Sequence, residues 1–125
     1  MSAEWVVLSP RHVDAAVVVG AAAAVDPDLG VRQLWDGNAL QLTTPDGVVL
    51  LTLIQSRRLE RTTDAERLLG PRSLTTPLFG GDETLWWTSV HVAAQDPFRA
   101  VAERIVRDVA AAAGGLPVAR SAVED

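Results

Sequence analysis

The residues best suited to binding or chemistry lie in the segment 83–98, which contains Trp86, Trp87 and His91. The segment is rich in aromatic and β-branched residues, and this composition predicts a strand over residues 85–93. Neighbouring side chains of a regular strand point to opposite faces of the sheet. The two adjacent tryptophans are therefore expected to serve two different surfaces.

The two faces of this predicted strand differ in character. Trp86 shares its face with Val90 and Val92, so we expect Trp86 to belong to the hydrophobic core. Trp87 shares the other face with His91, at a separation of roughly 13 Å along the strand. They cannot touch, but a ligand or a partner surface could span both. Trp87 either covers neighbouring strands or anchors an interface.

Neither histidine belongs to a recognisable catalytic or metal-binding set. A catalytic base needs a nearby nucleophile and an orienting acid, and the sequence shows no such group around His91. A zinc site would need His12, His91 and carboxylates from distant segments, because the chain has no cysteine. All 11 basic residues are arginine, and no dinucleotide-binding or Walker pattern is present. We therefore predict no catalytic residues, no metal and no cofactor, and favour a non-enzymatic role.

A small basic cluster follows the fourth predicted strand. Arg57, Arg58 and Arg61 could bind a carboxylate or a phosphate. Glu60 and Asp64 lie among them, which favours local ion pairs instead.

Composition excludes several classes of protein. The 125 residues carry a formal charge of −5, which argues against binding nucleic acid through its phosphates. The longest apolar run, "VDAAVVVGAAAAV", is too short to cross a membrane. The N-terminus lacks the positive flank and long apolar stretch of a signal peptide, so we expect a cytoplasmic protein.

Turn and capping signals divide the chain into alternating elements. Ser9-Pro10 and Asp96-Pro97 are typical of helix starts, and Asp-Gly pairs after residues 35 and 45 are typical of hairpins. These signals predict an α+β fold, an antiparallel four- to five-stranded sheet in the order β-α-β-β-β-loop-β-α with two main helices packed on one face. The predicted strands are 4–8, 31–35, 39–44, 48–56 and 85–93, and the predicted helices start at Pro10 and Pro97.

The remaining segments carry weaker patterns. Residues 57–84 are rich in Thr, Pro, Gly and charge, and we expect a loop that is functional or mobile. We assign residues 1–117 to a single α+β domain and residues 118–125 to a flexible tail.

The strand at 48–56 is apolar on both faces, with Leu50 and Ile54 on one face and Leu51 and Leu53 on the other. Two helices can cover one face of a sheet, so the other face would expose an apolar patch beside Trp87. A symmetric dimer, a partner protein or the 57–84 segment could cover this patch. The predicted interaction residues are Trp87, His91, Arg57, Arg58, Leu50 and Ile54.

These observations favour a non-enzymatic protein-interaction module, either self-associating or of an immunity or chaperone type, with a homodimer as the favoured assembly. The alternative is a small-ligand-binding or enzymatic domain. Its pocket would lie between the sheet and the 57–84 segment and be lined by Trp87, His91 and Arg58. A flat patch at Trp87 would favour the first hypothesis, and a closed pocket with convergent polar groups would favour the second.

Overall fold

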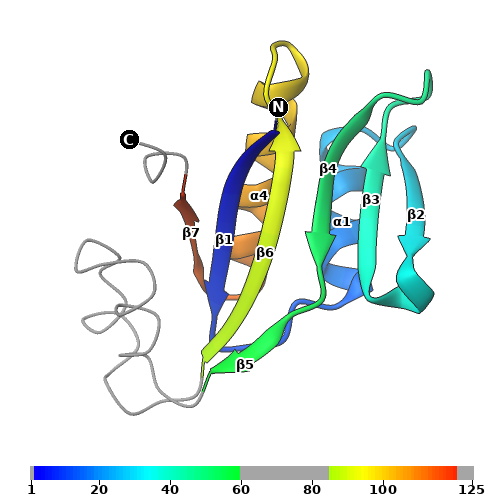
Figure 1. The fold of residues 1–125 in the computed structure, drawn as a ribbon. Helices are drawn as coiled ribbons and strands as arrows, with labels where there is room; N and C mark the ends of the chain where they lie inside the picture. The colour runs from blue at the N-terminus through cyan, green and yellow to red at the C-terminus, as the bar shows by residue number, and fades with distance from the viewer. Residues whose placement is uncertain (1, 60–84, 121–125) are drawn as a thin grey trace.

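A seven-stranded antiparallel sheet dominates the computed structural model, which describes residues 2–59 and 85–120 (Figure 1). The strand order is β2-β3-β4-β6-β1-β7, and β5 pairs with β6 beyond the end of β4. The elements are β1 (Ser2–Ser9), α1 (Ala15–Val25), β2 (Gly30–Leu34), the 3-10 turn η1 (Trp35–Gly37), β3 (Ala39–Thr43), β4 (Val49–Ile54), β5 (Arg57–Leu59), β6 (Leu85–Ala93), α4 (Phe98–Ala112) and β7 (Leu116–Ala119).

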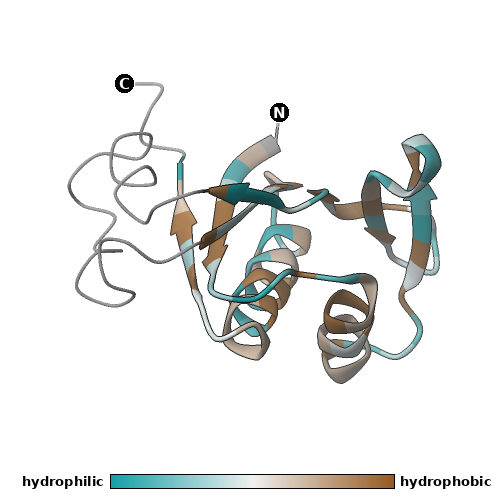
Figure 2. Cartoon of the chain, turned by 90° about the horizontal axis from the view of Figure 1, so that it is seen from below, coloured by the Kyte–Doolittle hydropathy of each residue, from teal (hydrophilic) through white to brown (hydrophobic). Residues whose placement is uncertain are grey.

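Both helices of the described part lie on one face of the sheet (Figure 2). Helix α4 lies behind β1 and β6, and α1 lies behind β3 and β4 (Figure 1). The predicted α+β class and the one-sided helix layer are confirmed. The strand count is higher than predicted. Residues 57–59, which form β5, were expected to lie in a loop, and residues 116–119, which form β7, were expected to follow the last helix without forming a strand.

The predicted hairpins are confirmed, since β2 pairs antiparallel with β3 and β3 with β4. In each turn a glycine supplies the positive φ that the backbone requires. Gly37 has a φ of 90° and Gly47 a φ of 89°. In the second turn, the amide of Gly47 donates to the carbonyl of Thr44 at 2.9 Å. The strand predicted at 85–93 is β6, with the same bounds.

A register shift in β4 changes which side chains reach the core. Leu42 pairs with Leu51 but Thr43 pairs with Val49, so Leu50 is an extra residue in the ladder. Leu50 and Leu51 are therefore both buried in the helix-side core. The expectation that Leu50 and Ile54 share an exposed face is wrong for Leu50, because strict alternation does not hold across a bulge.

The two predicted helix starts have different outcomes. Helix α4 begins at Phe98, one residue after the predicted start at Pro97, and the carboxylate of Asp96 accepts from the amide of Ala100 at 3.3 Å. The start at Ser9-Pro10 is wrong, because Ser9 is the last residue of β1. Helix α1 begins only at Ala15, where Asp14 caps it by accepting from the amide of Val17 at 2.9 Å.

The chain returns to the sheet after α4. Gly114 and Gly115 follow the helix, and β7 then pairs antiparallel with β1. Val118 and Ala119, predicted to begin a flexible tail, are strand residues. Residues 121–125 and 60–84 lie outside the described residues, and so do the predictions made for them.

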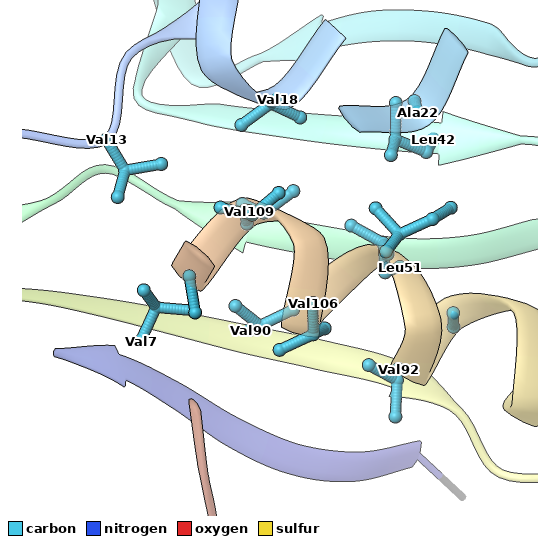
Figure 3. Packing of buried hydrophobic residues seen from close by; sticks show 14 of the residues in the cluster. Val7, Val13, Val18, Ala22, Leu42, Leu51, Val90, Val92, Val106 and Val109 are labelled. Atoms are coloured by element: carbon cyan, nitrogen blue, oxygen red, sulfur yellow. The ribbon is translucent and has the colours of Figure 1, made fainter. Parts of the chain in front are cut away.

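The main core lies between the helices and the sheet (Figure 3). Figure 3 shows valine side chains of β6 and α4 meeting Val18 of α1 and Leu51 of β4 in this layer. The labelled side chains in this layer include Val90 and Val92 of β6, Val106 and Val109 of α4, Val18 and Ala22 of α1, and Leu51 of β4.

A second, smaller cluster lies on the opposite face. Trp87 is 3% exposed and packs there with Val6, Leu8 and Leu85. Its indole nitrogen donates to the hydroxyl of Ser89 at 3.1 Å. The prediction that Trp87 lies beside an exposed apolar patch available to a partner is therefore wrong for Trp87 itself, because its side chain is buried.

Trp86 lies on the helix side, as predicted, but it is only half-buried and does not belong to the core. It lies near the start of β6, where its ring meets the ring of His12 edge-on at 4.8 Å. The connection before α1, rather than a helix, thus provides its cover.

Removal of Trp87 should cost far more stability than removal of Trp86. Trp87→Ala is expected to lower the free energy of unfolding by about 3–5 kcal/mol, as large aromatic deletions in cores do. Trp86→Ala should cost clearly less, because part of its surface is already in water and it lies outside the core cluster. Denaturant unfolding of both variants measures the difference, and an equal or larger loss for Trp86→Ala would contradict this packing.

Two glycines should respond oppositely to alanine. A Cβ at Gly115 would overlap the carbonyl oxygen of Leu8, so Gly115→Ala should cost about 1–3 kcal/mol or more. A Cβ at Gly20, in α1, meets nothing within 4 Å. Gly20→Ala should therefore raise the free energy of unfolding by up to about 1 kcal/mol, through helix propensity alone. Urea unfolding of both variants is the measurement, and destabilisation by Gly20→Ala would refute the open surface assigned to α1.

Candidate functional site

A row of polar side chains crosses the sheet face opposite to the helices. The register places Arg32 beside Gln41, Gln41 beside Thr52, Thr52 beside His91, and His91 beside Glu4. The amide of Gln41 donates to the hydroxyl of Thr52 at 3.4 Å, and His91 Nε2 lies 3.9 Å from Glu4 Oε2. The middle of this face is therefore polar rather than an apolar patch.

The structure does not bring the predicted pocket residues together. His91 belongs to the polar row, whereas Trp87 is buried in the smaller cluster, with the Arg120 guanidinium 5.6 Å from its ring centre. Arg57 and Arg58 are exposed on β5, opposite Trp87 and Trp86 respectively. Arg58 thus lies on the helix side of the sheet, away from Trp87 and His91.

Leu50 and Ile54, the other two predicted interaction residues, are not both available to a partner. Leu50 is fully buried, and Ile54 is half-buried next to Ala39 of β3. The six predicted residues therefore do not form one surface.

A small cavity lies between the start of α1, the first residues of β3 and the last residues of β4. Its volume is about 150 Å³, and its polar lining includes His12, Asp14, Asn38, Gln55 and Thr88. Pockets for drug-sized ligands are usually about 300–1,000 Å³. The hydroxyl of Thr88 already bonds to Ser56 at 2.6 Å, which leaves it little capacity for a ligand.

A wider hollow of about 600 Å³ lies beyond the last β4–β6 pair, and Gln95 is its one polar side chain. Within residues 2–59 and 85–120, no group of three or more histidine or acidic side chains could hold a metal ion. None of the helices described is long and apolar enough to span a membrane.

The β2 end of the sheet is exposed. We call it the β2 edge and define it as Gly30–Leu34 together with Trp35. Strand β2 pairs with β3 on one side, and no strand in the described part of the chain pairs with its other side. Val31 is 45% exposed and Trp35 is 64% exposed. The backbone donors and acceptors on this side are thus open to another strand.

Strand β7, at the opposite end of the sheet, is protected against pairing with a further strand, whereas β2 is not. Strand β7 has four residues, and one is Pro117, which has no amide hydrogen to donate. Proline and charged residues are common means of blocking an edge. Strand β2 has no proline, and Arg32 is its single charge. Of the two ends, β2 is therefore the one able to accept a strand.

Trp35 holds an unfavourable backbone conformation on the surface. Its φ is 53°, and Asp36 follows with a φ of 57°. The left-handed region costs about 1–2 kcal/mol for a residue other than glycine, and this exposed side chain recovers little by burial. Strained, exposed aromatic residues of this kind point to a function outside the fold.

Sequence reasoning missed this site because Trp35 was predicted to end a strand. The available signal was a large aromatic residue directly before Asp36-Gly37, at a hairpin tip that folding alone would leave in water.

No protein-family model matches this chain, and searches of curated proteins and of solved structures also find no match. A functional assignment therefore depends on the geometry of the sheet and its edges.

Proposed function

We propose that this chain is a non-enzymatic protein-interaction module that binds a β-strand along its β2 edge. The observation that carries the proposal is the exposure of Trp35 beside β2, a proline-free strand whose outer side has no partner strand within the described residues. An immunity-type or chaperone-type protein would use such an edge to hold a strand of its target. We also propose a cytoplasmic location.

Strand addition explains why both backbone and side chains are exposed here. Main-chain hydrogen bonds to an added strand supply affinity, and alternate side chains supply specificity. Val31 offers an apolar contact on the helix side of the sheet, because it pairs with the core residue Leu42. Trp35 offers a large aromatic surface at the end of the strand, and tryptophan is enriched among residues that dominate binding energy.

The cavity near α1 supports the alternative of a small-ligand-binding domain less well. Its volume of about 150 Å³ suits only a few heavy atoms. Asp14, which lines it, already accepts a hydrogen bond from the backbone of α1. The β2 edge therefore supports binding of a protein segment better than the cavity supports binding of a metabolite.

Peptides selected for binding should depend on the β2 edge. Peptides would first be selected from a random display library for binding to the wild-type chain. We expect these peptides to bind the Val31→Asp and Trp35→Asn variants at least about tenfold more weakly than they bind the wild type. Val49→Asp is the matched control, because Val49 is a strand valine of similar exposure, 43% against 45% for Val31. Calorimetry with the selected peptides measures the affinities.

Nuclear magnetic resonance then locates the bound peptides. Shifts confined to β2 and Trp35 support the proposal. If the peptides bind all three variants equally and shift His12 and Asp14 at the cavity, or if selection yields no edge-dependent peptide, the proposal fails.

Trp35→Asn should separate binding from stability. Asparagine tolerates the left-handed conformation better than tryptophan, so the free energy of unfolding should stay within about 0.5 kcal/mol or rise. A binding residue whose removal leaves the fold intact is expected at a functional site. Thermal and denaturant unfolding test this, and a loss of more than about 2 kcal/mol would show that Trp35 serves the fold instead.

A further inference from the structure

Resting on the proposed function, we further propose that the strand accepted at the β2 edge is β2 of a second copy of this chain. The two strands would run antiparallel across a two-fold axis that passes through Gln33. The assembly would join the two sheets into one continuous sheet.

Symmetry restricts how β2 can pair with itself. Residues directly opposite each other in an antiparallel pair point to the same face of the sheet. A two-fold axis perpendicular to the sheet must therefore pass through a residue position, because adjacent residues face opposite ways. The central candidates within β2 are Val31, Arg32 and Gln33.

Charge disfavours the middle candidate. An axis at Arg32 would place this guanidinium directly opposite its own copy, and like charges at such positions are destabilising. No acid within the strand could compensate, because Arg32 is the single charged residue of Gly30–Leu34.

Apolar matching separates the other two candidates. An axis at Val31 pairs Val31 with itself and leaves Trp35 opposite Pro27, outside the paired segment. An axis at Gln33 brings Val31 of each copy to the point where β2 of the other copy ends and Trp35 begins the turn η1. This register brings the two large exposed apolar residues of the β2 edge near each other twice, once on each side of the axis.

The Gln33 register also suits the polar residues. The two Gln33 side chains meet on the axis, where each amide can donate to and accept from the other. Arg32 lies opposite Leu34 of the second copy, so its charge remains at the solvent-facing side without a like-charged neighbour directly across. The strand is thus complementary to itself in one register.

Cysteine cross-linking reads the register directly, because the wild-type chain has no cysteine. Only the residue on the two-fold axis faces its own copy, at a Cβ separation of about 4.5–5.5 Å, close to disulfide distance. Gln33→Cys should therefore form a disulfide-linked dimer under mild oxidation at least tenfold faster than Val31→Cys or Arg32→Cys. Val49→Cys, on another strand, is the control for random collision.

The outcomes distinguish this inference from the proposed function. Fastest cross-linking at Val31→Cys or Arg32→Cys, or none above the Val49→Cys rate, overturns it. Trp35→Asn added to Gln33→Cys should slow cross-linking about tenfold, and unchanged cross-linking also counts against it. A wild-type chain that is monomeric by light scattering but binds edge-dependent peptides would refute the second copy and leave the proposed function standing.

Discussion

The pairing of β1 with β6 is the constraint on which the rest of the sheet depends. It runs without interruption from Ser2 opposite Ala93 to Ser9 opposite Trp86. β7 then extends the sheet from β1, and β4 and β5 extend it from β6. Among the described residues, the hairpins of β2, β3 and β4 pair with this centre only at Leu51–Leu53. The long β1–β6 ladder is therefore the part of the sheet to which the other strands attach.

This arrangement explains why the proposed interaction site is an edge and not a face. The helices cover one face, and the polar row from Arg32 to Glu4 together with the cluster around Trp87 occupies the other. Apart from the three-residue β5, which carries Arg57 and Arg58, the sheet then ends at β7, which contains Pro117, and at β2, which has no proline. An exposed Trp35 at the unprotected end makes binding of a further strand the role that best fits the fold.

Elements defined by local pattern could be predicted from the sequence, and features set by tertiary context could not. Strand β6 and the start of α4 follow from composition and from Asp96-Pro97, and the β2–β4 hairpins follow from their glycine turns. The short strands β5 and β7 form because β6 and β1 offer them free edges. The burial of Leu50 depends on a bulge, and the burial of Trp87 depends on neighbours distant in sequence. The β2 edge was missed because strand order is not encoded locally.

Amide hydrogen exchange at low and high protein concentration tests most directly whether the β2 edge accepts a strand from a second copy. Protection of Gly30–Leu34 should rise with concentration, because outward amides gain partners, while protection of Leu116–Ala119 stays constant. Unchanged exchange in β2 at concentrations where the chain associates, or protection gained at β7 or on the polar face instead, would contradict the account.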